Sequence, residues 1–188
     1  MNPRVVIKTP ARLHLGIINP FNPKYRLYMS LGVAIDYPNN IVVVHSNKPF
    51  MIQGCRSSEI YDKIARIIDE YDLKTGYVYI EKCIPRHVGL GSTTQLLLAV
   101  AHGLLLANNI DEDIETIARK LGLGSVSGVG TYVYKYGGFI IDSGKKSLHE
   151  FPRLIFRHDF PSKWRFIVIT PRGIGLDEKQ EEAVFREP

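Results

Sequence analysis

The sequence lacks the features that define several common classes of protein. Its 188 residues include two cysteines, one tryptophan and three methionines. Two cysteines far apart make neither a disulfide framework nor a metal-binding set, so we expect Cys55 and Cys83 to be buried thiols of a reducing compartment. Lys/Arg runs do not exceed pairs, and no zinc-finger or RNP-type motif occurs, which argues against nucleic acid as a partner.

Long apolar runs are scarce as well. The longest one, residues 96–107, contains His102 and is too short to cross a bilayer. The first residues contain no apolar core of the length that a signal peptide needs. We therefore expect a cytoplasmic protein without a membrane partner.

The residues that are present suit a globular domain that prefers anions. Hydrophobic residues make up 45% of the chain, which is enough for a core, and the formal net charge is +5. A positive balance favours anionic ligands, phosphates included. The length predicts one domain or slightly more.

Hydrophobic periodicity predicts strands first, then helices, then strands again. Residues 38–40, Pro-Asn-Asn, are interpreted as a hairpin turn, and residues 8–10 as a break between strands. The order predicts an α+β fold rather than a doubly wound sheet. The expected strands cover residues 4–8, 12–18, 31–37, 41–45, 77–83, 138–142, 151–157 and 164–170, and the expected helices cover residues 57–71, 96–107 and 111–121, the last with Asp111 as N-cap; residues 131–136 fit either type.

The most informative segment is residues 85–95, Pro-Arg-His-Val-Gly-Leu-Gly-Ser-Thr-Thr-Gln, called here the phosphate loop. A glycine-rich turn that leads into a helix brings backbone N–H groups close to an anion. Ser92 and Gln95 have the spacing of a capping box, so a capped helix without a ligand is the alternative interpretation. The segment matches neither the Walker pattern nor G-x-G-x-x-G. The predicted phosphate-binding residues are Gly89, Leu90, Gly91, Ser92, Thr93 and Thr94.

A second glycine-rich segment covers residues 122–130, Gly-Leu-Gly-Ser-Val-Ser-Gly-Val-Gly, called here the second glycine loop. Its many exposed N–H groups predict a second anion nest, with Ser125, Ser127, Gly128 and Gly130 as candidates. A flexible connection between helices explains the same composition.

Five further residues carry chemistry that suits an anionic ligand. Arg12 and His14 share one face of a predicted strand, where a guanidinium and an imidazole suit a phosphate or a carboxylate; a solvated strand face is the alternative. His87 lies inside the phosphate loop and is a candidate acid toward a leaving pyrophosphate, or else structural. Asp36 and Asp142 end predicted strands and are candidates for Mg²⁺, or else turn caps.

The ordered set of motifs resembles the GHMP kinase superfamily. Residues 9–16, Thr-Pro-Ala-Arg-Leu-His-Leu-Gly, are similar to its first motif, and residues 85–93 to its phosphate loop. Residues 87–95, 127–144 and 156–166 are closer to one branch, the β-ribofuranosylaminobenzene 5′-phosphate synthases of archaea.

The resemblance implies a fold and a reaction. The fold is the GHMP N-terminal domain (ribosomal protein S5 domain 2-like), a mixed sheet with helices on one face, expected over residues 1–172. Residues 173–188 are then a polar tail that leads toward a C-terminal domain, which the synthases have and this chain lacks. The implied glycosyltransferase reaction condenses phosphoribosyl pyrophosphate with 4-hydroxybenzoate or 4-aminobenzoate in methanopterin-type cofactor biosynthesis, releasing CO₂ and pyrophosphate. Mg²⁺ is the expected cofactor, and ATP is not expected.

Two alternatives stay open. The first is a small-molecule ATP kinase of the same superfamily, although kinases carry a catalytic Asp close behind the second glycine loop and here the next acid is Asp142. The second is a non-catalytic subunit. In either case a second copy, or a separate chain that carries the C-terminal domain, is expected to cover an open sheet edge or apolar interface.

Overall fold

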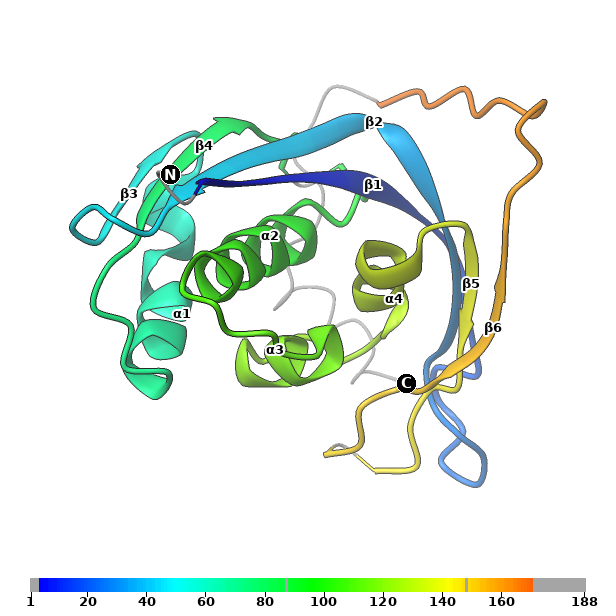
Figure 1. Cartoon of the computed structure of the whole chain (residues 1–188). Helices are drawn as coiled ribbons and strands as arrows, with labels where there is room; N and C mark the ends of the chain where they lie inside the picture. Colours follow the sequence, from blue (N-terminus) through cyan, green and yellow to red (C-terminus); the bar gives the residue numbers. More distant parts are fainter. Residues whose placement is uncertain (1–3, 87, 148, 171–188) are drawn as a thin grey trace.

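The computed structural model describes residues 4–86, 88–147 and 149–170. In these residues six strands form one mixed sheet, and four helices lie on its concave face (Figure 1). This arrangement confirms the predicted α+β fold with helices on one face. The elements are β1 (Arg4–Ile18), β2 (Met29–His45), β3 (Met51–Gly54), α1 (Ser57–Glu70), β4 (Tyr77–Lys82), α2 (Ser92–Ala107), α3 (Ile114–Lys120), α4 (Val129–Tyr136), β5 (Phe139–Asp142) and β6 (Leu154–His158).

Two long antiparallel strands, β1 and β2, organise the sheet. They pair from Arg4 opposite His45 to Ile18 opposite Met29. The other side of β2 pairs with β4 near one end and with β5 near the other. β3 extends the sheet beside β4 in parallel, and β6 extends it beside β5. Among the described strands, β1 therefore pairs with β2 alone and leaves one side as an outer edge.

The core is centred on α2, which packs against β1 and β2 with α1 and α4 on either side of it and α3 on the side away from the sheet (Figure 1). α2 is buried nearly all round, as its continuous apolar sequence predicts. α1 faces the core with Ile60, Ile64 and Ile67, which follow the helical spacing and are fully buried. The predicted helices at residues 57–71 and 96–107 are thus confirmed.

The predicted hairpin at residues 38–40 is wrong, because β2 continues through these residues. Thr9 pairs with Asn40 and Ala11 pairs with Ile35, so residues 36–39 bulge out of the ladder opposite Pro10. For the same reason the expected break in β1 is a bulge within one strand. Asn40 is fully buried: its amide donates to Thr9 Oγ1 at 2.9 Å and accepts from the Ile84 N–H at 2.9 Å.

The predicted capping box at the start of α2 is also wrong. The helix begins at Ser92 with Gly91 as N-cap, and no side chain of the N-cap closes it. Gln95 is fully buried instead, and its amide donates to the carbonyl oxygen of Gly130 at 2.7 Å. A tertiary contact therefore takes the place of the expected local one.

Four other expectations have different outcomes. The N-cap of α3 is Asp113, which accepts from the Glu115 N–H at 2.9 Å, and not Asp111. Residues 131–136 are helical, within α4. Residues 164–170 form no strand, because none of the described strands pairs with them. The proposed tail at residues 173–188 lies outside the described residues.

The prediction of two reduced thiols is wrong in this structure. Cys55 and Cys83 form a disulfide, with their Cα atoms 6.2 Å apart across a sequence separation of 28. The parallel pairing of β3 and β4 brings them together, since Gly54, the last residue of β3, lies opposite Ile80, two positions before the end of β4. Separately, no helix in the described ranges has both the length and the apolar character that crossing a membrane requires.

Candidate functional site

The phosphate loop is fastened to the outer edge of β1. The side chain of Leu90 is buried in a small apolar cluster with Ala11, Ile35 and Ile84. Its carbonyl oxygen accepts the backbone N–H of Arg12 at 3.0 Å. The loop is therefore held by both the side chain and the backbone of one residue, and Arg12 is brought beside it.

Two glycines shape the loop in different ways. Gly89 (φ 72°) and Gly91 (φ 66°) both adopt the left-handed conformation. A Cβ atom on Gly91 would lie 3.2 Å from both Cβ and Nε of Arg12, whereas one on Gly89 would meet open space. The Arg12 side chain thus lies directly against the residue that precedes α2.

The start of α2 has the properties of an anion site. N–H groups in the first turn of a helix have no partner within the helix, and the helix dipole places positive charge there. Gly91, the N-cap, has no side chain that could fill this role, and Arg12 adds a guanidinium beside it. Ser92 is buried at this end, while Thr93 and Thr94 are half-buried. This agrees with the predicted phosphate-binding role, which no bound ligand tests.

His14 follows Arg12 by two positions on β1. Burial lowers the pKa of His14 to about 4, and the nearby Arg12 charge lowers it as well. The imidazole is therefore neutral at pH 7. His87, the predicted acid of the phosphate loop, lies outside the described residues.

A cluster of charged residues beside the phosphate loop was missed by sequence reasoning. Arg56 donates to the Thr93 hydroxyl at 2.9 Å and to the Ile84 carbonyl oxygen at 3.4 Å. Its Nε also donates to Glu59 at 2.9 Å, and Glu59 lies 3.2 Å from Nε of Arg86. Arg86 was visible within the loop sequence, but no sequence signal places Arg56 there, because 37 positions separate it from Thr93.

The second glycine loop is held by a carboxylate of the protein itself. Asp142 is fully buried and accepts four hydrogen bonds. The N–H groups of Ser30 and Gly144 donate to Oδ1 at 2.9 and 3.0 Å, and Gly128 N–H and Ser127 Oγ donate to Oδ2 at 2.7 and 3.2 Å. Burial raises the pKa of Asp142, and these donors oppose the rise. The Ser127 hydroxyl and the Gly128 N–H therefore donate to Asp142 and not to a ligand.

Gly130 is the second-loop residue that lies beside the phosphate loop. A Cβ atom at Gly130 would lie 2.9 Å from Cγ2 of Thr94, so α2 and α4 meet closely near their first turns. Ser125 is exposed, and its carbonyl oxygen accepts from Nζ of Lys145. The structure therefore places Gly130 beside the phosphate loop, whereas Ser127 and Gly128 bind Asp142 of the protein itself.

The two candidates for Mg²⁺, Asp36 and Asp142, lie far apart. Asp142 contacts Ser30 on β2, while the exposed Asp36 lies six positions further along the same strand. At the rise of a β-strand this separation is roughly 20 Å. Across residues 4–86, 88–147 and 149–170, no group of three or more His, Cys, Asp or Glu side chains is placed to hold a metal ion.

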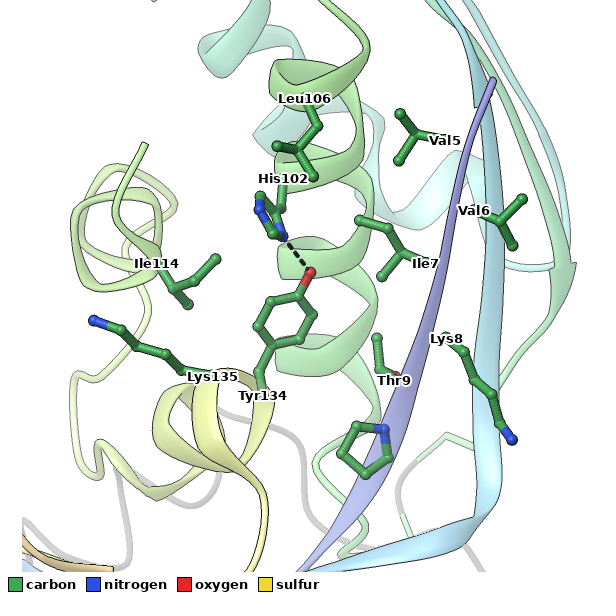
Figure 2. A pocket seen from close by; sticks show the side chains of 11 residues that line it. Val5, Val6, Ile7, Lys8, Thr9, His102, Leu106, Ile114, Tyr134 and Lys135 are labelled. Carbon is green, nitrogen blue, oxygen red and sulfur yellow. Dashed lines mark hydrogen bonds between the residues drawn. The ribbon is translucent and has the colours of Figure 1, made fainter. Parts of the chain in front are cut away.

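A groove of about 350 Å³ opens elsewhere, between β1 and helices α2, α3 and α4. Figure 2 shows His102 and Tyr134 facing each other within it, and the His102 Nδ1 atom lies 2.9 Å from the Tyr134 hydroxyl. Burial lowers the pKa of His102, against a smaller opposing effect of Asp111. His102 is ten positions along α2 from Ser92, roughly 15 Å at the helical rise, and none of the described residues of the phosphate loop lines the groove.

Comparisons with known proteins identify the fold. Residues 59–138 match the family model of the GHMP kinases N terminal domain. Phosphomevalonate kinase from Streptococcus pneumoniae superposes with a TM-score of 0.59 at 16% identity, over 75% of this chain and 48% of the kinase. Mevalonate kinase from Methanococcus jannaschii gives 0.53 at 16% identity, over 73% and 53%. The chain has the fold of the GHMP kinase N-terminal domain.

The sequence is also similar to one kind of enzyme along nearly its whole length. It is 28% identical to the β-ribofuranosylphenol 5′-phosphate synthase of Methanocaldococcus jannaschii over 97% of this chain and 64% of the synthase. The synthase of Methanothermobacter thermautotrophicus is 26% identical over 97% and 63%. The chain thus spans slightly less than two thirds of the curated relatives that it matches.

Proposed function

We propose that this protein is a synthase that transfers a phosphoribosyl group in methanopterin-type cofactor biosynthesis. It joins phosphoribosyl pyrophosphate to 4-hydroxybenzoate or 4-aminobenzoate, with release of CO₂ and pyrophosphate. The similarity to two archaeal synthases supports the enzyme class. The word phenol in their names favours the hydroxy acid. We propose the cytoplasm as the location, because substrates of this kind are charged and water-soluble.

The observation that carries the proposal is the position of Arg12 against Gly91 at the start of α2. Phosphoribosyl pyrophosphate has an anionic group at each end of the sugar, and helix N–H groups together with a guanidinium suit either group. The neutral His14 nearby suits the carboxylate or the ring hydroxyl of a benzoate as a hydrogen-bonding partner. Both partners of the reaction thus have a matching group on adjacent elements.

In this proposal, Arg12 and the first N–H groups of α2 stabilise the negative charge on the departing pyrophosphate. Donors that are already fixed in position stabilise such charge without reorganising during the reaction. The fastening of Leu90 to Arg12 supplies this fixation. Mg²⁺ is proposed to accompany the diphosphate, where it would neutralise negative charge.

A thermal-shift measurement with Mg²⁺ plus phosphoribosyl pyrophosphate, and in parallel with Mg²⁺ plus ATP, tests the proposal. A ligand that binds the native state alone raises the melting temperature by mass action. We expect stabilisation by phosphoribosyl pyrophosphate. Stabilisation by ATP alone would replace the proposal with the kinase alternative. No shift with either ligand would favour a non-catalytic subunit.

Turnover is then measured as pyrophosphate release that depends on an added benzoate. We expect release with 4-hydroxybenzoate, and the rate with 4-aminobenzoate decides between the two acids. Arg12→Ala should weaken binding of phosphoribosyl pyrophosphate by about tenfold, because one charge-assisted contact is lost. Arg4→Ala, an exposed arginine on the same strand, is the matched control and should bind normally.

A further inference from the structure

We propose that Arg56 is a positioning residue for the phosphate loop and that the Cys55–Cys83 disulfide holds it in place, so that reduction weakens anion binding. The inference rests on the proposed function, because it concerns the same loop. It adds a residue and a redox dependence that the loop motif does not contain.

Arg56 contacts both ends of the phosphate loop. Its guanidinium donates to the carbonyl oxygen of Ile84, just before the loop, and to the hydroxyl of Thr93, near the loop's end. The fork geometry of a guanidinium allows one side chain to span two acceptors in this way. Glu59 holds the same guanidinium from the other side, at 2.9 Å from Nε and 2.5 Å from Nη2.

The Arg56 side chain is well buried, with 9% of it exposed. Its donors are directed at protein acceptors, so we assign it to shaping the loop rather than to contacting the ligand. Ile84 is also held on its N–H side by Asn40. The start of the loop is therefore clamped between a neutral amide and a guanidinium, and the guanidinium is the part that depends on the disulfide.

The disulfide joins the two segments that carry this clamp. Cys55 immediately precedes Arg56, and Cys83 immediately precedes Ile84. Arg56 itself adopts a left-handed conformation (φ 61°), which an arginine rarely adopts unless its surroundings enforce it. A covalent link one residue away provides such enforcement.

Reduction removes this constraint by a balanced exchange. A dithiol reductant supplies two electrons and two protons, the bond between the two Sγ atoms breaks, and two thiols remain while the reductant becomes a disulfide. The segments around Arg56 and Ile84 then keep only their backbone pairing and side-chain contacts. We expect Thr93 and the first N–H groups of α2 to lose a fixed position.

The test is the affinity for inorganic pyrophosphate, measured by isothermal titration calorimetry on the full chain before and after treatment with a dithiol. We expect binding about tenfold weaker after reduction, the size of one lost charge-assisted hydrogen bond. Cys55→Ser/Cys83→Ser should bind like the reduced protein and ignore the reductant. Circular dichroism of each sample checks that the fold is retained.

Arg56→Ala keeps the disulfide and separates positioning from general stability. If the disulfide acts through Arg56, the oxidised variant should already bind about tenfold more weakly, and the reductant should add less than about twofold, since two changes on one contact are not additive. Arg66→Ala, an exposed arginine on α1, the helix that begins directly after Arg56, is the matched control and should keep the full response to reductant. Arg56→Lys should recover part of the affinity.

Hydrogen exchange at Gly89, Gly91 and Thr93 gives a readout that needs no ligand. These amides should exchange faster after reduction and in Arg56→Ala. Equal pyrophosphate affinity in the oxidised and reduced forms would overturn the inference and leave the proposed function standing. Absence of pyrophosphate and phosphoribosyl pyrophosphate binding in both forms would overturn both.

Discussion

Gly89 and Gly91 adopt the same backbone conformation but differ in their surroundings. Alanine substitutions at the two positions therefore distinguish the cost of backbone strain from the cost of a steric contact. Gly89→Ala should cost about 1 kcal/mol of unfolding free energy, the penalty for a left-handed alanine. Gly91→Ala should cost about 2 to 3 kcal/mol, because its Cβ also displaces Arg12. Urea unfolding measures both. Equal losses would contradict the contact between Gly91 and Arg12.

His14 makes stability depend on pH in a defined window. Its pKa is about 4 when folded and near 6.5 when unfolded, so the unfolded chain binds more protons between these values. Stability is therefore complete above pH 6.5 and falls as the pH drops toward 4. Between pH 7 and pH 5 we expect His14 to account for a loss of about 2 kcal/mol.

The measurement is urea unfolding at both pH values, with His14→Gln for comparison. The variant cannot titrate, so it should lose about 2 kcal/mol less than the natural sequence over the same interval. His102, whose pKa is also lowered, contributes equally to both proteins and cancels. A variant with the same pH dependence as the natural sequence would show that His14 is charged when folded.

At the scale of elements, Asp142 connects β2, β5 and the start of α4. Asp142→Asn keeps the shape but replaces one acceptor with a donor that faces N–H groups. We expect a loss of about 3 kcal/mol in unfolding free energy, because buried donors lose their partner. Asp62→Asn, an exposed carboxylate on α1, should change it by less than about 0.5 kcal/mol. A small effect at Asp142 would contradict the four-donor arrangement.

The methyl group of Thr94 limits how closely α4 can approach α2 at Gly130. Gly130→Ala should destabilise the protein by about 2 kcal/mol, because the added Cβ meets Cγ2 of Thr94. Thr94→Ser removes that methyl group and should recover about half of the loss in the double variant. A double-mutant cycle by thermal unfolding measures the coupling, which we expect to be about 1 kcal/mol. Additive effects would contradict the close approach.

Periodicity predicted most elements because it reflects which face of each element is buried. The helical spacing of Ile60, Ile64 and Ile67 is local information, and so is the apolar run of α2. Asn40, by contrast, occurs in a sequence typical of turns and becomes a buried link between Thr9 and Ile84. Local composition cannot show which of these outcomes a polar residue has, because the deciding partners are distant in sequence.

The candidate site also combines features that local sequence predicts with features that depend on distant partners. The glycines of the phosphate loop and Arg12 were predicted, since a loop before a helix has its own sequence signature. Arg56 could not be predicted, because its contact with Thr93 depends on how β3 and β4 pair. The same pairing explains why Cys55 and Cys83 were wrongly expected to stay apart.

For the molecule as a whole, the run of residues 164–169 leaves apolar side chains in water. Ile167 and Ile169 are 89% and 86% exposed. Such a patch promotes association between copies or with another chain. Ile167→Ser/Ile169→Ser should lower the mean mass seen by light scattering, with little change in unfolding free energy. Ile155→Ser, an exposed isoleucine outside the run, is the control and should leave the mass unchanged.

Asp142 also affects where an anion can bind. A protein with free N–H groups at the start of two helices would have two binding sites for a diphosphate, and the ligand could bind in two orientations. Because the Asp142 carboxyl group accepts hydrogen bonds from the Gly128 N–H and the Ser127 hydroxyl, these two donors are not available to another anion. An anionic ligand is therefore expected to bind at the Arg12 end of the site.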